Sequence, residues 1–201
     1  MDRIDVRRAW DAVSETYANR RNPKGSDAAL VGELLERLPT DPLVVDVGCG
    51  DGARTLDNLP DDGIGLDLSR TGLDLAAVRG HRARLLQADV AAIPLRDSIA
   101  DGITAYHVVF HVPRSAHSAV YREFARVLKP GGTLLMTLPG GRFETVQHGW
   151  MGGSMFFSAP GRDRTLDQLR DAGFENVRTV TVDDPLGTSS EFLFADNGST
   201  A

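Results

Sequence analysis

The sequence predicts an α/β fold in which helices cover both faces of a mostly parallel sheet. From about residue 43 onward, segments typical of strands alternate with segments typical of helices, a pattern that favours parallel sheets. The first of these strands ends in a turn with glycine at positions 48, 50 and 52, where a ligand can approach the backbone because no side chains block it. With 201 residues, of which 41% are hydrophobic, the chain is long enough for one domain with a sizeable core.

The expected elements follow one another along the chain with short connections. Two helices precede the first strand, at residues 5–20 and about 27–38, with Ser26 as the N-cap of the second. Five strands are then expected, at residues 43–47, 63–67, 83–88, 102–108 and 132–138. Helices should alternate with them at residues 53–58, at 70–79 behind the capping residue Ser69, and at 116–128.

The part of the chain after the fifth strand is rich in glycine. Residues 139–162 contain six glycines and are expected to form a flexible insertion. The remaining expected elements are a helix at about 164–172, a closing β-hairpin of residues 176–182 and 190–195 connected by residues 183–187, and a frayed tail at 197–201.

Composition and charge argue against several classes of function. The net charge is −6 and no basic stripe is present, so a DNA or RNA partner is disfavoured because it would need a basic footprint. No apolar run approaches the ~20 residues that span a membrane, and the first residues lack the order of a signal peptide. The single cysteine, Cys49, cannot form an internal disulfide. Together these observations predict a cytoplasmic enzyme without a nucleic-acid or membrane partner.

Acidic residues accompany the glycine turn. Asp46 precedes the turn, and Asp67 ends the next expected strand 21 residues later, where an open α/β sheet places an acid to bind ribose hydroxyls. This pattern indicates an adenosine-containing cofactor. The pattern Gly48-x-Gly50-x-x-Ala53 also fits a dinucleotide fingerprint, so the glycines alone leave the cofactor open.

Three further features favour a cofactor that carries an amino acid over a dinucleotide. Asp46 suits a cationic ammonium group and would repel a pyrophosphate. Asp89 ends the third expected strand, where a carboxylate can accept a hydrogen bond from an adenine amino group. Two helices precede the first strand, whereas dinucleotide-binding domains commonly begin with that strand.

In these motifs the sequence resembles the class I S-adenosylmethionine-dependent methyltransferases, in particular the small single-domain members with small-molecule acceptors. The resemblance covers roughly residues 40–195. Five segments match the family's motifs in order, namely residues 44–52, 65–69, 87–94, 101–113 and 126–132.

The resemblance implies a Rossmann-like sheet of seven strands in the order 3-2-1-4-5-7-6, with the seventh strand antiparallel, and S-adenosylmethionine as the cofactor. Residues 1–38 would form an N-terminal helical lid or appendage, and residues 39–196 the cofactor-binding domain. The cofactor-binding positions are expected to be Asp46 and Gly48 at the methionine part, Cys49 and Gly50 in the turn, Asp67 at the ribose, Leu68, Asp89 and Val90 at the adenine, and Tyr106 and Tyr17 near the reactive methyl group or the carboxylate.

The methyl acceptor is expected to bind where the fourth strand ends. Methyl transfer from a sulfonium is an in-line displacement, so a general base is needed only when the acceptor is protonated. His107 and His111 follow this strand and are the candidate catalytic residues, although either could instead only pack the loop. The pair lacks a third ligand, so no metal site is expected.

Aromatic and methionine side chains should supply the other wall of the acceptor pocket. Trp10 and Tyr17 lie seven residues apart and therefore share one face of the first helix, although Trp10 could instead dock on the core. The glycine-rich insertion should cover the far side with Trp150, Met151, Met155 and Phe156.

The expected function is methyl transfer to an O, N or C atom of a small, partly apolar molecule by a monomer or homodimer. Two other functions stay open on the sequence. One is a regulatory protein that binds the cofactor without turnover, and the other is an NAD-type oxidoreductase, because the glycine pattern also fits a dinucleotide.

Overall fold

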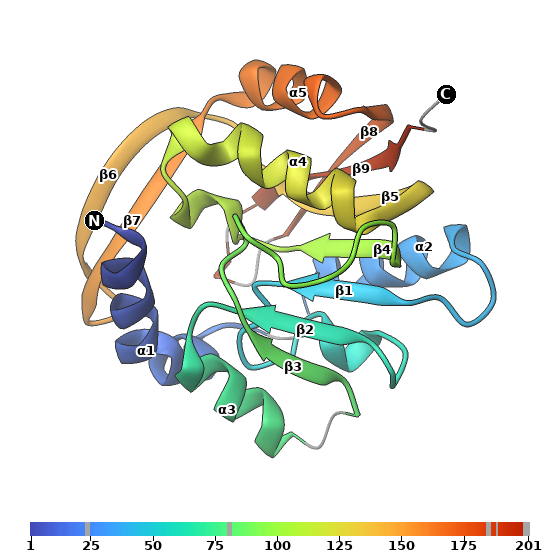
Figure 1. Ribbon diagram of the computed structural model, residues 1–201. Coiled ribbons are helices and arrows are strands. Elements are labelled where there is room, and N and C mark those ends of the chain that lie inside the picture. The colour runs from blue at the N-terminus through green and yellow to red at the C-terminus, as the bar shows by residue number, and fades with distance from the viewer. Residues whose placement is uncertain (23–24, 80–81, 184–185, 188, 199–201) are drawn as a thin grey trace.

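A seven-stranded sheet forms the centre of the computed structural model, with its strands in the order β3-β2-β1-β4-β5-β9-β8 (Figure 1). The structure describes residues 1–22, 25–79, 82–183, 186–187 and 189–198. The strands of this sheet are β1 (Val44–Val47), β2 (Ile64–Asp67), β3 (Arg84–Gln87), β4 (Ala100–Ala105), β5 (Leu128–Leu138), β8 (Phe174–Asp183) and β9 (Ser189–Asn197).

The pairing of these strands confirms the predicted topology. β1 to β5 run parallel to one another, while β9 is antiparallel to both β5 and β8. β9 is therefore the predicted antiparallel seventh strand of the main sheet, and β8 is the sixth. The predicted division of the chain at residue 38 stays a prediction.

The central strands are buried because helices cover both faces of the sheet. All residues of β1 and β4 are buried, as expected for parallel strands that read as near-continuous apolar runs. On one face, α4 and α5 lie side by side (Figure 1); on the other, α2 buries Leu30, Val31 and Leu34 against strand side chains. The helices are α1 (Arg3–Arg20), α2 (Ala29–Arg37), α3 (Arg70–Val78), α4 (His117–Val127) and α5 (Arg162–Asp171).

The expected helix at residues 53–58 is wrong. The chain instead makes a turn and only a short 3-10 helix, Leu56–Asn58. The turn buries Arg54 and Thr55, whose side chains bind Asp27 and Asp46 respectively. These long-range polar contacts hold the backbone away from a regular helix.

Of the two expected helix caps, one is confirmed and one is wrong. The Ser69 side chain accepts from the backbone N–H of Gly72 and so caps α3. Ser26 begins a short 3-10 helix (Ser26–Ala28), and its hydroxyl accepts instead from the N–H of Asp183, at 3.0 Å, which joins this segment to β8.

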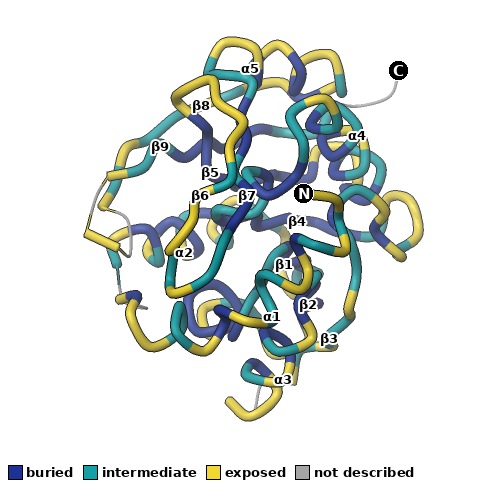
Figure 2. Tube along the Cα trace, turned by 90° about the vertical axis from the view of Figure 1, so that its left-hand side faces the viewer, coloured by how far each residue is buried: buried dark blue, intermediate teal, exposed yellow. Residues whose placement is uncertain are grey.

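The glycine-rich residues 139–162 form an ordered hairpin, so the expected flexible insertion is wrong. β6 (Arg142–Trp150) and β7 (Gly153–Pro160) pair antiparallel as a separate two-stranded sheet. Gly149 and Gly152 have φ angles of 78° and 86° at the hairpin turn, which is the conformation that favours glycine there. β6 is mostly exposed and β7 mostly buried (Figure 2).

The hairpin lies beside α1, on the side of the sheet toward which β1, β2 and β4 point (Figure 1). α1 packs against α3 and β7. This arrangement sets a helix and a hairpin opposite the carboxyl ends of the central strands, where open α/β sheets bind ligands.

Two sequence expectations lie partly outside the described residues. These are the hairpin connection, at residues 184–185, and the tail, at residues 199–201.

Candidate cofactor and acceptor site

A single cavity of about 330 Å³ joins the glycine turn to α1 and the β6–β7 hairpin. Its walls come from the carboxyl ends of β1, β2 and β4 on one side and from the helix and hairpin on the other. The predicted site residues on its lining are Tyr17, Gly48, Cys49, Gly50, Asp67, Leu68, Val90, Tyr106, His107 and His111. Asp46 and Asp89 do not line it.

The turn after β1 needs its glycines for two different physical reasons. Gly48 and Gly50 have φ angles of 72° and 55°, which other residues rarely adopt. A Cβ on Gly48 would lie 2.6 Å from the side chain of Val108, so packing forbids it. A Cβ on Gly50 would meet no atom within 4 Å, and this open space beside the backbone is what a bound ligand would need.

Asp67 connects the glycine turn to the beginning of α3. Its two carboxylate oxygens accept from the backbone N–H groups of Gly50, at 2.8 Å, and Ser69, at 2.7 Å. Burial raises the pKa of Asp67, and these hydrogen bonds act in the opposite direction. Each carboxylate oxygen can accept a further hydrogen bond, so Asp67 can still receive ribose hydroxyls.

Asp46 lies behind the cavity wall. It is buried and accepts from the hydroxyl of Thr104 at 2.6 Å and from that of Thr55. Burial raises its pKa to about 7. The carboxylate therefore ties β1 to β4 and to the turn, and its direct contact with a cofactor stays a prediction.

Asp89 is held by Arg3, a residue for which the sequence offers no signal. The Arg3 guanidinium donates to both carboxylate oxygens, at 2.6 and 2.9 Å, and also to the carbonyl oxygen of His111 at 2.5 Å. Half-burial raises the pKa of Asp89, but the Arg3 hydrogen bond, the backbone N–H of Ala91 and the Arg3 charge together outweigh it and leave the pKa lowered. Asp89 is thus ionised at neutral pH.

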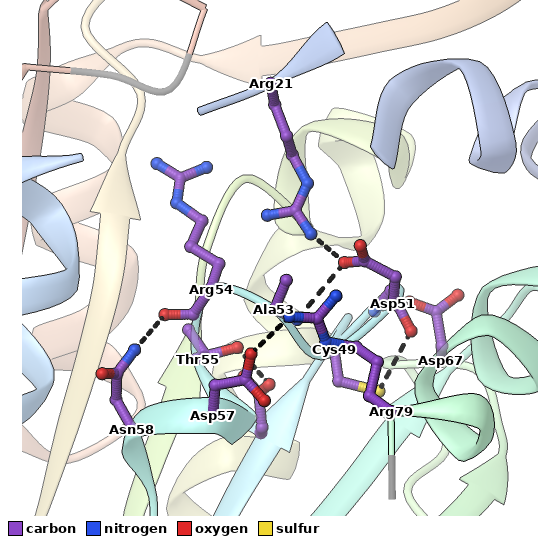
Figure 3. A network of polar contacts seen from close by, with 12 residues as sticks. Arg21, Cys49, Asp51, Ala53, Arg54, Thr55, Asp57, Asn58, Asp67 and Arg79 are labelled. Carbon is purple, nitrogen blue, oxygen red and sulfur yellow. Dashed lines mark hydrogen bonds and ion pairs between the residues drawn. The ribbon is translucent and has the colours of Figure 1, made fainter. Parts of the chain in front are cut away.

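Two buried ion pairs at the cavity are also nearly without a signal in the sequence. Arg21 pairs with Asp51 beside the glycine turn (Figure 3), and Arg54 pairs with Asp27. All four side chains are nine-tenths buried or more, and burial without a partner would be costly for each charge. The spacing of Tyr17 and Arg21 is the one available signal, since residues four apart share a helix face; the Arg21 guanidinium lies 5.4 Å from the Tyr17 ring centre.

Aromatic rings from α1 and the hairpin form the wall opposite the glycine turn. Trp10 makes edge-to-face contacts with Tyr17 and Trp150, both at 5.5 Å between ring centres. Trp150 also contacts Phe157 at 5.6 Å. The predicted shared face of Trp10 and Tyr17 is confirmed, and we call Trp10, Tyr17, Trp150 and Phe157 the aromatic wall.

The hairpin contributes different residues from those expected. Trp150 lines the cavity as predicted, together with Phe143 and Phe157, whereas Met151, Met155 and Phe156 do not. Met155 and Phe156 are buried. Phe156 and Phe157 are neighbours on β7, so their side chains point to opposite faces of the hairpin, and only that of Phe157 reaches the cavity.

His107 and His111 both line the cavity but differ in their partners. The ring of His111 is buried against Trp10, at 5.0 Å between ring centres, and its Nδ1 lies 2.8 Å from the carbonyl oxygen of Phe156. A carbonyl only accepts, so Nδ1 carries the hydrogen and Nε2 is the acceptor of the ring. Burial lowers the pKa of His111 to about 4, so the ring is neutral at pH 7. The Nε2 of His107 lies 3.3 Å from the Arg54 guanidinium.

Other predicted positions pack the base of the cavity. The Tyr106 hydroxyl donates to the carbonyl oxygen of Asp27 at 2.9 Å, and burial raises the pKa of this phenol. Cys49 lines the cavity and is buried against Leu56 and Leu73, and its contact with a cofactor stays a prediction.

Neither a metal-binding group nor a membrane-spanning helix occurs in the part of the chain that the structure describes. No three side chains of His, Cys, Asp or Glu there form a group that could hold a metal ion. No helix among these residues is both long and apolar enough to cross a membrane.

Comparison with known proteins places this site in context. A family described as "Methyltransferase domain" matches residues 45–136, the segment from β1 to β5 that carries the glycine turn, Asp67 and Asp89. One relative is a tRNA (carboxymethyluridine(34)-5-O)-methyltransferase of Arabidopsis thaliana, 29% identical over 66% of this chain and 32% of its own length. The chain thus matches about a third of that relative.

Two further proteins are similar over most of this chain. The 27-O-demethylrifamycin SV methyltransferase of Amycolatopsis mediterranei is 26% identical over 87% of this chain and 60% of its own length. The crystal structure of magnesium protoporphyrin IX methyltransferase from Synechocystis PCC 6803, with bound S-adenosylhomocysteine, superposes with a TM-score of 0.76 at 16% identity, covering 98% of this chain and 100% of that one.

Proposed function

Because this chain belongs to the class I S-adenosylmethionine-dependent methyltransferase family, we propose that it transfers a methyl group from S-adenosylmethionine to a small, largely apolar acceptor. The observation that carries the proposal is the single cavity. It joins the glycine turn and Asp67 to the aromatic wall, so that a cofactor and an acceptor would meet in one cavity.

The cofactor half of the cavity fits the group that the family uses. When bound, S-adenosylmethionine supplies an activated methyl group on a sulfonium. Asp67 would hold the ribose hydroxyls, and Leu68 and Val90 would pack on the adenine. The open space beside Gly50 admits a ligand against the backbone. Arg21 lines the same region, and the N–H groups of its guanidinium that do not bind Asp51 would donate to the carboxylate of the cofactor.

The acceptor half orients a substrate mainly by shape. The aromatic wall and Phe110 offer flat apolar surface, which suits an acceptor with a ring or an extended apolar part. His111 is neutral and its Nε2 accepts hydrogen bonds, so it would receive a proton-bearing hydroxyl or amine of the acceptor. Exclusion of water by the helix and hairpin would protect the transfer.

RNA is a second candidate acceptor, because relatives such as the Arabidopsis thaliana enzyme are named for tRNA modification. The net charge of −6 argues against it, since phosphate contacts need a basic surface.

An isotopic methyl-transfer screen tests the proposal. The chain is incubated with S-adenosylmethionine labelled on the methyl group, in parallel with a metabolite extract and with total cellular RNA. Label in a small molecule supports the proposal, and label in RNA alone supports the second candidate. Binding of S-adenosylhomocysteine without labelling of any acceptor would instead indicate a regulatory protein.

A further inference from the structure

Arg3 joins the two halves of the cavity. Its guanidinium binds both oxygens of Asp89 and the carbonyl oxygen of His111. Asp89 follows β3 on the side where the adenine is proposed to lie, whereas His111 lies beside the aromatic wall. One side chain therefore contacts the cofactor side and the acceptor side at once.

The position of Arg3 is fixed by the way α1 begins. Asp2 and Asp5 form a capping box, in which each side chain accepts from the backbone N–H of the other residue. Arg3 is the first residue of the helix, so its backbone is held by this cap. Trp10 lies seven residues later, which returns to the same face of the helix after about two turns.

The middle of α1 has a separate attachment. Asp11 accepts from the hydroxyl of Ser69 at 2.7 Å, and Ser14 lies 3.3 Å from the same hydroxyl. These contacts dock the helix on the beginning of α3. Arg3 accordingly attaches the first two turns of the helix, up to Trp10, to the rest of the domain.

We propose that Arg3 is a positioning residue that holds the first two turns of α1 closed over the adenine side of the cavity and thereby assembles the aromatic wall. The inference rests on the proposed function, because it takes the adenine to lie beside Asp89. The Arg3 pair is bidentate and charge-assisted, a geometry that is strong and directional. Oδ1 of Asp89 also accepts from the backbone N–H of Ala91, whereas Oδ2 accepts only from Arg3 and keeps one acceptor site, so an adenine amino group can bind there while Arg3 stays in place.

The two tryptophans of the chain make this inference measurable without substrate. Both, Trp10 and Trp150, belong to the aromatic wall, with ring centres 5.5 Å apart. Tryptophan emission and its quenching by acrylamide in the ligand-free chain therefore report directly on whether the wall is assembled.

The test compares Arg3→Met with Arg7→Met, a matched change at an exposed arginine of the same helix. Arg3→Met should shift the emission to longer wavelength and raise the acrylamide quenching constant about twofold, because the first turns open. S-adenosylhomocysteine affinity should fall about tenfold, because an ordered lid contributes to binding. Arg7→Met should change neither quantity.

Two further variants separate the positioning role from a loss of folding. Asp89→Asn should raise quenching as Arg3→Met does, and the double variant should add little, since both changes break one interaction. Arg3→Lys keeps the charge without the bidentate geometry and should give intermediate values.

Equal quenching in the Arg3→Met and Arg7→Met chains would overturn the proposal. Raised quenching with unchanged S-adenosylhomocysteine affinity would also overturn it, because Arg3 would then only hold the helix. If the wild-type chain binds no S-adenosylhomocysteine, the proposed function fails, and the positioning of the cofactor side fails with it.

Discussion

The two walls of the cavity are built in opposite ways. The sheet wall consists of the glycine turn, Asp67 and the strand ends, and its geometry is set by main-chain hydrogen bonds such as those that Gly48 and Cys49 donate to Leu66. The aromatic wall consists of side-chain rings from α1 and from the hairpin, segments more than 100 residues apart in the sequence. Ring contacts and one arginine hold it together.

This difference separates recognition of the cofactor from recognition of the acceptor. A wall made of backbone and buried carboxylates tolerates few substitutions and suits a ligand that stays the same. A wall made of packed rings can change with the residues that line it, and it suits an acceptor that differs among relatives.

The largest effect is expected for Gly50→Val, which should abolish S-adenosylhomocysteine binding measured by calorimetry. The new side chain would fill the open space beside the turn, and the φ angle of 55° strains it as well. Gly131→Val is the matched control, because Gly131 has a φ angle of 78° and equally open surroundings but does not line the cavity. Equal binding of S-adenosylhomocysteine by both variants would show that the glycine turn is not part of the cofactor site.

Asp67→Ala should weaken S-adenosylhomocysteine binding by about 2–3 kcal/mol, because ribose hydroxyls lose a charged acceptor. Asp67→Asn should fall between this variant and the wild type, since it keeps one acceptor oxygen. Asp61→Ala removes an acid that is 77% exposed and should leave the affinity unchanged. Binding of Asp67→Ala within threefold of wild type would contradict the assignment.

An effect on stability, and not on cofactor binding, is expected from His111, whose ring packs against Trp10 of the aromatic wall. Its pKa is about 4 in the fold against an ordinary 6.5, so the unfolded chain takes up a proton first as the pH falls. The stability that neutral His111 contributes is thus present above pH 6.5 and lost toward pH 4, by roughly 3 kcal/mol at most.

Urea unfolding of the wild type and His111→Gln between pH 7 and 4 measures this contribution. The difference between the two chains isolates His111, because Asp46, whose pKa is raised to about 7, loses stabilisation as the pH rises and acts in the opposite direction in both. His148→Gln, at an exposed position, is the control. Parallel curves for wild type and His111→Gln would show that the ring is not buried in its neutral form.

The same contrast explains what could be predicted from the sequence. The alternation of strands and helices, the glycine turn and the place of Asp67 follow from local patterns, since a strand, its turn and its terminal acid are contiguous. The strand order follows only from the resemblance to the methyltransferase family. The hairpin could not be predicted, because glycine-rich segments are also typical of flexible loops. Here the glycines serve the turn between β6 and β7. Arg3, Arg21 and Asp27 gave no motif, because their partners are fixed only by tertiary packing.

Hydrogen exchange with and without S-adenosylhomocysteine tests the central claim most directly, namely that two unlike walls close on one cofactor. Residues 44–47 of β1 should be protected equally in both states. Residues 5–22 and 145–158 should exchange more slowly when S-adenosylhomocysteine is bound, because a ligand between the two walls opposes local opening of the helix and the hairpin. Equal protection of residues 5–22 with and without ligand would contradict the account, and would leave α1 as a fixed packing element with no part in closing the cavity.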